Sequence, residues 1–189
     1  MSFEDFSKKE SVVVVYTGEG KGKTSASLGL MCRALGTGWR VAYMQFIKLW
    51  DVGEHDFIRS IMPIYEEKLD FYKGGLGFYD AGDMTAEDTS DAEHRARARL
   101  TYDFAQGAAA SGKYDLVICD EINNAVHDGL LDVADLAHII ETKHPRTSLC
   151  LTGRHFPRNL IKDVDIATNM TKLKHHFDDK FLANKGIDY

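Results

Sequence analysis

The segment at residues 12–34 constrains the fold of this chain more than any other. It opens with a β-branched apolar run, continues as TGEGKGKT at residues 17–24, and then has helical composition. This order predicts a buried strand, a glycine-rich loop and a helix. The three glycines let the backbone turn its N–H groups inward onto an anion, and the helix directs its positive end to the same place. The segment therefore predicts a phosphate-binding loop, with a simple glycine-rich turn as the alternative.

The last two residues of the loop carry the chemistry of a nucleotide site. Lys23 supplies a mobile positive charge for the phosphates, and Thr24 supplies a hydroxyl ligand for the Mg²⁺ that accompanies a nucleoside triphosphate. The usual pattern begins with glycine five residues before Gly22, where this chain has Thr17, and Gly18 moves the first flexible position one residue later. We therefore expect a loop one residue tighter than usual, holding a phosphate chain whose orientation can differ from the usual one.

Length and composition predict one domain over residues 1–189, with a flexible segment at 1–10. The 189 residues are 44% hydrophobic and 28% charged, which is ordinary for a globular domain. The net charge of −6 argues against a protein whose main role is to hold nucleic acid, because that role needs a surplus of Lys and Arg. Without an apolar run for secretion or a membrane span, we expect a cytoplasmic protein with no nucleic-acid or membrane partner. The scattered Cys32, Cys119 and Cys150 indicate neither a disulfide framework nor a zinc site.

Apolar runs and helical segments alternate along most of the chain. Continuous apolar runs are typical of parallel strands covered on both faces. The alternation predicts an α/β fold with a mainly parallel sheet and helices on both faces. The expected strands are 11–16, 40–46, 69–72, 114–120, 147–152 and 166–170, and the expected helices are 24–35, 54–62, 90–111, 132–142 and 157–164.

Two of these strand ends carry charged residues that can reach a ligand. Asp120 and Glu121 end the strand at 114–120, and the carboxyl ends of strands form the ligand-binding edge of open α/β sheets. Both carboxylates are therefore predicted to face the loop and a metal ion. The alternative, an acidic cap on the following helix, explains one carboxylate but not the pair. Arg154 follows the strand at 147–152 and can either reach a phosphate oxygen or lie on the surface.

Residues 74–89 form the least regular region, with four glycines among apolar and aromatic side chains. Two interpretations are open, a mobile turn and a lid that closes over an apolar ligand.

Several stretches together resemble one family, the cob(I)alamin (corrinoid) adenosyltransferases of the phosphate-loop type, over residues 11–189. The resemblance implies a P-loop nucleotide-binding (RecA-like) fold and transfer of the 5′-deoxyadenosyl group of ATP to cobalt(I) of cobalamin or a precursor corrinoid, releasing triphosphate. Family members bind ATP reversed relative to ordinary P-loop enzymes, which agrees with the displaced first glycine. The stretches are TGEGKGKT with Arg33-Ala34, QFIK at 45–48, DLVICDE at 115–121, LTGR at 151–154, and Lys174-His175 with KGIDY at 185–189.

The resemblance also implies a role for individual residues. Lys21, Lys23 and Phe78 are expected to act in catalysis, and Leu76 and Phe78 fall where aromatic residues cover the corrin face in the family. The segment 172–189 is expected to lie over the site. ATP, Mg²⁺ and a corrinoid are the implied ligands, with an electron-donating reductase or flavoprotein and a homodimer as partners. Expected ATP ligands are Gly18, Glu19, Gly20, Lys21, Gly22, Lys23, Thr24, Ser25, Arg33 and Arg154; expected metal ligands are Thr24, Asp120 and Glu121; and expected corrinoid contacts are Gln45, Phe46, Leu76 and Phe78.

The chemistry of this reaction agrees with the residues that the chain offers. Cobalt(I) is itself the nucleophile, so attack on the ribose 5′ carbon needs no protein base or covalent intermediate. Two alternatives remain at this point. One is a P-loop phosphotransferase or ATPase that makes ADP; the presence of Thr17 where the usual pattern has its first glycine argues against it. The other is a corrinoid carrier that binds ATP without turnover.

Overall fold

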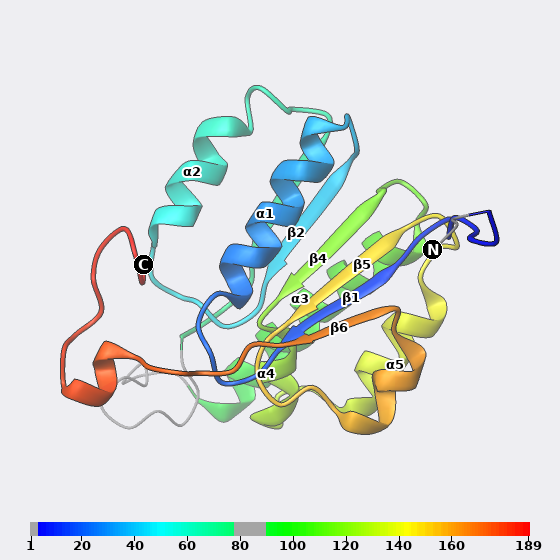
Figure 1. Ribbon diagram of the computed structural model, residues 1–189. Helices are drawn as coiled ribbons and strands as arrows, with labels where there is room; N and C mark the ends of the chain where they lie inside the picture. Colours follow the sequence, from blue (N-terminus) through cyan, green and yellow to red (C-terminus); the bar gives the residue numbers. More distant parts are fainter. Residues whose placement is uncertain (1–3, 78–89) are drawn as a thin grey trace.

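The computed structural model describes residues 4–77 and 90–189, and within them the chain forms one six-stranded sheet (Figure 1). The strand order is β3-β2-β4-β5-β1-β6. All neighbouring strands are parallel, so the prediction of a mainly parallel sheet is confirmed. The strands are β1 (Val13–Thr17), β2 (Val41–Gln45), β3 (Leu69–Lys73), β4 (Leu116–Asp120), β5 (Ser148–Thr152) and β6 (Ile166–Asn169).

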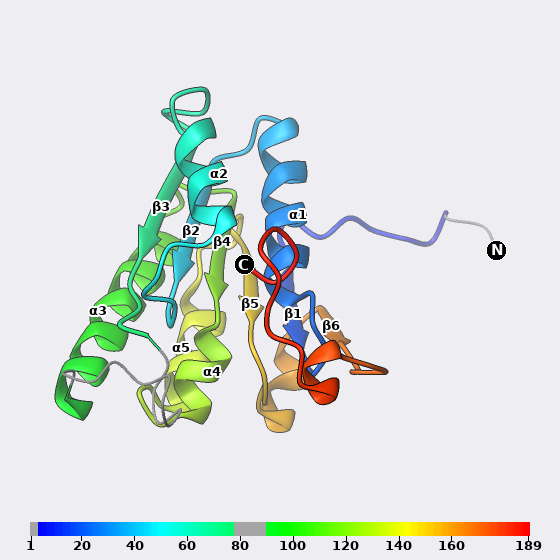
Figure 2. The same cartoon turned by 90° about the vertical axis from the view of Figure 1, so that its left-hand side faces the viewer.

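Helices cover both faces of the sheet, as predicted (Figures 1 and 2). One face carries α1 (Lys23–Gly36) and α2 (Gly53–Ile61). The other carries α3 (Asp91–Ala110), α4 (Ile122–His127) and α5 (Val133–Thr142). The start of α3 is fixed by Ser90, whose hydroxyl accepts the N–H of Glu93, as in a capping box.

The structure departs from the expected elements in three places. The segment expected as a helix at 157–164 is a 3₁₀ helix, η2 (Arg158–Asp163). Helix α4 was not predicted, because six residues are too few to display a helical repeat of apolar positions. A second 3₁₀ helix, η3 (His176–Asp179), interrupts the C-terminal segment 172–189, which is called the tail below.

The core has two halves, because successive strand residues point to opposite faces of the sheet. Tyr43 and Ile118 pack with α1 and α2. Ala42, Met44 and Val117 pack with α3, α4 and α5. Both faces are therefore buried, which is why β2 and β4 read as continuous apolar runs.

The parallel arrangement brings the carboxyl ends of all strands to one edge of the sheet. Residues 4–10 extend away from the body of the domain (Figure 2). The cysteines form no disulfide; Cys119 and Cys150 are buried and Cys32 is exposed. None of the helices in the described residues has the length and apolar character needed to cross a membrane.

Candidate functional site

The glycine loop joins the end of β1 to the start of α1, and its glycines are required by their surroundings. Gly18 and Gly22 have φ angles of 98° and 112°, a region that favours glycine. A Cβ on Gly18 would lie 2.4 Å from the Asn169 Oδ1 atom, and one on Gly20 would lie 2.7 Å from the Met170 carbonyl oxygen. Gly20 also donates its N–H to that oxygen, at 2.6 Å. The segment after β6 therefore presses directly on the loop and sets its shape.

Lys23 lies half-buried behind the loop. Its ammonium donates to the carbonyl oxygens of Gly18 and Gly20, both at 2.7 Å. Burial, followed by the nearby Arg154 charge, lowers the pKa of Lys23. Both causes act against the positive charge, so an anion placed on the loop would relieve them.

Asp120, at the end of β4, is fully buried and already has three hydrogen-bond donors. Its Oδ2 atom accepts from the Thr24 hydroxyl at 3.2 Å and from the Gln45 amide at 3.1 Å, and its Oδ1 atom accepts from the Thr152 hydroxyl at 2.7 Å. Thr152 in turn accepts the N–H of Glu121 at 2.9 Å. Asp120 thus links the loop to the strand ends of β2, β4 and β5.

Glu121 differs from Asp120 in having an unused oxygen. It has a left-handed backbone (φ 64°) at the start of α4, and its Oε2 atom is buried with no hydrogen-bond partner in the part of the chain that the structure describes. Burial, and then the Asp120 charge, raise the pKa of Glu121 to about 7. The unpaired Glu121 Oε2 atom and the Thr24 hydroxyl line the same pocket and are the oxygen ligands that Mg²⁺ prefers. These residues therefore fit a magnesium ion.

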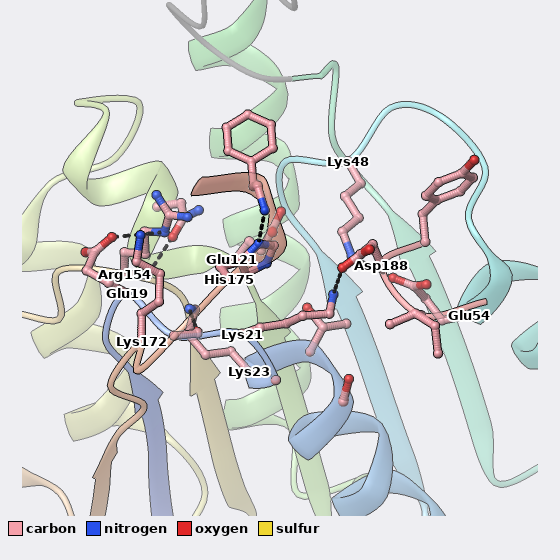
Figure 3. A pocket seen from close by; sticks show the side chains of 18 of the residues that line it. Glu19, Lys21, Lys23, Lys48, Glu54, Glu121, Arg154, Lys172, His175 and Asp188 are labelled. Atoms are coloured by element: carbon pink, nitrogen blue, oxygen red, sulfur yellow. Dashed lines mark hydrogen bonds and ion pairs between the residues drawn. The ribbon is translucent and has the colours of Figure 1, made fainter. Parts of the chain in front are cut away.

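The loop and Glu121 open onto a pocket of about 1210 Å³ at the carboxyl edge of the sheet (Figure 3). Its wall comes from the loop and first turn of α1, the start of α2, the segments after β2, β4 and β5, and the tail. The charged residues that line it are Glu19, Lys21, Lys23, Lys48, Glu54, Glu121, Asp128, Arg154, Lys172, Asp178 and Asp188.

The tail contributes one wall of the pocket and an ion pair. The Lys21 ammonium lies 2.9 Å from Asp188 Oδ1 (Figure 3). The other Asp188 oxygen accepts the N–H of Asn184 at 2.7 Å. Lys172 and His175 also line the pocket from the tail.

A buried lysine and glutamate pair was not singled out as functional from the sequence. Lys48 lies 2.6 Å from Glu54 (Figure 3), and both side chains are less than a fifth exposed. Burial acts to lower the pKa of Lys48, but the carboxylates of Asp120, Glu121 and Glu54 outweigh it and raise the pKa. The available signal was a lysine three residues beyond the end of β2, at the ligand edge of the sheet.

The structure brings most of the expected ATP and metal ligands together and leaves others outside the pocket. Residues 19–25, Glu121 and Arg154 line it, and the Arg154 side chain lies 3.5 Å from Glu19. Arg33 is in the last turn of α1, about 15 Å from Lys23 along the helix axis.

The expected corrinoid contacts are not gathered in this way. Gln45 and Phe46 are buried, at 0% and 2% exposure, and Leu76 is half-buried. None of these three is among the described residues that line the pocket. Phe78 falls outside the described residues.

The fold and the loop define a class of protein. A glycine-rich loop between β1 and α1 of a parallel sheet, ending in Lys-Thr and facing the acidic end of β4, is the arrangement of P-loop nucleotide-binding proteins. The solved structure of the flagellar accessory protein FlaH from Methanocaldococcus jannaschii shares the fold, with a TM-score of 0.52 and 13% identity over 85% of this chain and 71% of that chain.

The chain belongs to the ATP:corrinoid adenosyltransferase family (BtuR/CobO/CobP), whose family model matches residues 9–189. It is 30% identical over 182 residues to the corrinoid adenosyltransferase of Pseudomonas aeruginosa, covering 96% of this chain and 85% of that protein. It is 28% identical to the corrinoid adenosyltransferase of Escherichia coli, covering 96% of this chain and 87% of that protein. The resemblance read from the sequence is thus confirmed, and ATP and a corrinoid are the substrates that the family implies.

Proposed function

We propose that the pocket holds ATP with its triphosphate on the loop and its ribose 5′ carbon open to a reduced corrinoid. The cobalt(I) electron pair forms the new cobalt–carbon bond, the C5′–O5′ bond breaks, and triphosphate leaves with the electrons of that bond. The observation that carries the proposal is the meeting of the loop, the unpaired Glu121 carboxylate and Arg154 in one pocket of a chain of this family.

The protein's own contribution is to fix the geometry and to stabilise charge on the departing triphosphate. Loop N–H groups donate hydrogen bonds to the phosphate oxygens, and the Lys23 ammonium donates to phosphate in place of its two carbonyl partners. Lys21 gives up its ion pair with Asp188 to bind phosphate, and Arg154 gives up its ion pair with Glu19 in the same way. Each exchange replaces an internal contact by a charge-assisted hydrogen bond to the ligand.

We propose that the Thr24 hydroxyl and the Glu121 carboxylate hold a magnesium ion. When bound, the ion would neutralise part of the charge on the triphosphate. Asp120 orients both ligands, because its own oxygens already accept hydrogen bonds from Thr24, Gln45 and Thr152.

The corrinoid is proposed to enter from the side of the pocket nearest Leu76. By the family resemblance, Leu76 and Phe78 would cover the corrin face and favour removal of the lower cobalt ligand. Phe78→Ala is then expected to impair reaction with cobalt(II) substrate far more than ATP binding, and an equal loss of both would contradict this role. Gln45 and Phe46 support this side of the site from the interior.

The family resemblance supports three further proposals. The chain acts as a homodimer, receives electrons from a reductase or flavoprotein, and works in the cytoplasm. The segment 172–189 is proposed to cover the bound nucleotide, as a part of the single domain.

Product analysis tests the proposed reaction. The protein is incubated without oxygen with ATP, Mg²⁺ and chemically reduced cobalamin, while the absorption spectrum follows the cobalt–carbon product and chromatography follows the nucleotide. We expect adenosylcobalamin and triphosphate in equal amounts, and intact ATP when the corrinoid is omitted. Formation of ADP would indicate a phosphotransferase or ATPase, and intact ATP in the complete mixture would indicate a carrier; either result overturns the proposal.

A further inference from the structure

A chain of buried polar side chains runs from α2 to the phosphate loop, outside the pocket itself. It consists of His55 on α2, Gln45 at the end of β2 and Asp120 at the end of β4. All three are 0% exposed. Gln45 joins the other two, since its Oε1 atom contacts His55 Nε2 and its Nε2 atom donates to Asp120 Oδ2 at 3.1 Å.

The direction of every hydrogen bond in this chain is fixed by its neighbours. A carboxylate can only accept, so Gln45 must turn its NH₂ group to Asp120 and its carbonyl oxygen to His55. His55 must then carry its proton on Nε2. The other ring nitrogen, Nδ1, receives the N–H of Val52 at 3.3 Å and also lies 3.3 Å from Asp51 Oδ1. Because burial lowers the pKa of His55, the ring is neutral and Nδ1 is its acceptor. This assignment follows from the network of partners.

The same carboxylate fixes the two proposed metal ligands. Asp120 accepts from the Thr24 hydroxyl directly, and it holds the Thr152 hydroxyl that receives the Glu121 N–H. A displaced Asp120 side chain would therefore move both ligands together.

We infer that His55 and Gln45 are positioning residues for the metal–nucleotide site, acting through Asp120 on Thr24 and Glu121. This inference rests on the proposed function, because it assigns the network a purpose in binding Mg²⁺ with ATP. Buried polar groups are costly unless all are satisfied, and a fully satisfied network specifies one arrangement of its members. Partners of metal ligands have large effects for the same reason, typically about 10- to 100-fold in affinity or activity.

Two substitutions at His55 separate this role from simple core packing. His55→Gln keeps an N–H donor near the position of Nε2, whereas the shorter His55→Asn withdraws it from Gln45. Gln45→Met is a second disrupting variant, which keeps the length of the side chain and removes both hydrogen bonds. Tyr43→Phe is the matched control, because it removes a buried hydrogen bond to Ser27 (2.8 Å) from the same strand and the same face.

The experiment measures ATP binding by calorimetry without corrinoid, in EDTA and across a Mg²⁺ titration, together with thermal unfolding. We expect His55→Asn and Gln45→Met to raise the Mg²⁺ concentration at half-maximal enhancement of binding by about tenfold. Binding in EDTA should change by less than about twofold, since the loop itself is intact. His55→Gln and Tyr43→Phe should keep the wild-type Mg²⁺ midpoint.

Two results would overturn the inference. One is a lower unfolding temperature in His55→Asn and Gln45→Met with an unchanged Mg²⁺ midpoint, which would make the network purely structural. The other is an equal effect of His55→Gln and His55→Asn, which would show that the Nε2 donor is irrelevant. If the wild-type protein itself binds no ATP with Mg²⁺, the proposed function fails instead, so the two failures are distinguishable.

Discussion

Lys23 is the side chain on which the loop depends most directly. Its ammonium now holds the carbonyl oxygens of Gly18 and Gly20, and in the proposed complex it holds phosphate. Lys23→Ala should therefore slow adenosyl transfer by at least about tenfold, because a charge-assisted contact is worth about 1.5–3 kcal/mol. Single-turnover formation of the cobalt–carbon bond measures the effect.

The matched control for that substitution is Lys113→Ala. Lys113 pairs with Asp70 at 3.1 Å on the surface, before the start of β4 and so at the opposite edge of the sheet. Its removal should leave turnover unchanged. An unchanged rate in Lys23→Ala would mean that the nucleotide does not lie on the loop.

Glu121 should make the stability of the metal-free protein depend on pH. Burial and the Asp120 charge raise its pKa from 4.5 to about 7, so folding favours the protonated form. Glu121 therefore contributes stability that is fully present below the unfolded pKa of 4.5 and is lost as the pH rises through about 7. The Glu121→Gln variant cannot ionise at this position, so its stability does not fall in this way as the pH rises.

Thermal unfolding in EDTA tests this expectation. An unpaired buried group costs about 1–3 kcal/mol, and in a domain of this size 1 kcal/mol corresponds to about 2–4 °C. Glu121→Gln should thus unfold several degrees higher than wild type near pH 8, with a smaller difference near pH 5. The exposed control Glu141→Gln should show no such pH-dependent gain. A gain that is the same at both pH values would refute the titration of Glu121.

At the residue scale, the sequence predicted which residues lie at the ligand edge better than which side chains are buried there. The loop glycines, Lys23 and Glu121 follow from local patterns and strand ends, which fix a residue's place at the ligand edge. Gln45 stands at the same edge, and its sequence position does not reveal that its side chain turns inward between His55 and Asp120. That orientation is set by tertiary packing of α2 against the sheet, which no local pattern encodes.

At the scale of elements, the tail is a mostly exposed segment. Asp188 joins it to Lys21 of the loop, and the backbone N–H of Asn184 and the Lys21 charge hold the pKa of Asp188 at about 2. Asp188→Asn should release Lys21 for phosphate and tighten ATP binding by only a few-fold, because the Lys21 side chain is 43% exposed and ion pairs open to solvent are weak. It should also speed tryptic cleavage within 172–189. Calorimetry and a timed digest measure the two effects.

Asp179→Asn is the control for the tail. Asp179 pairs only loosely with Lys174, at 3.8 Å, and it is not among the described residues that line the pocket. Neither ATP affinity nor cleavage should change in this variant. Weaker ATP binding in Asp188→Asn would instead indicate that Asp188 contacts the nucleotide.

All six strands and the longer helices were predicted from the sequence, whereas the shortest helix and the path of the tail were not. β2 and β4 are continuous apolar runs, and α3 is a long segment rich in Ala and Arg that is followed by Gly112. By contrast, α4 is short, and the path of the tail depends on exposed side chains and one turn. Such contacts leave no periodic signature in the sequence.

For the whole molecule, the alternation of strands and helices was enough to predict a parallel sheet with one ligand edge. The strand order was not predicted, since several crossover orders satisfy the same alternation. The observed order puts β1 between β5 and β6. This order brings Arg154 and the segment after β6 to the loop, and it explains why the tail lies at the pocket.

The orientation of ATP over the whole site gives the sharpest test of the reaction class. In the proposed reaction the broken bond is C5′–O5′, at the far end of the triphosphate from the γ-phosphorus. An ATP analogue with an imido or methylene bridge between its β and γ phosphorus atoms keeps that C5′–O5′ bond.

We therefore expect the analogue to support cobalt–carbon bond formation within about tenfold of the ATP rate, since its altered bridge disturbs only contacts to the leaving group. A phosphotransferase or ATPase must break the bridge and would be blocked by it. Stopped-flow spectra of reduced cobalamin with ATP and with the analogue give the comparison, and complete loss of product with an analogue that still binds would place the chemistry at the γ-phosphorus.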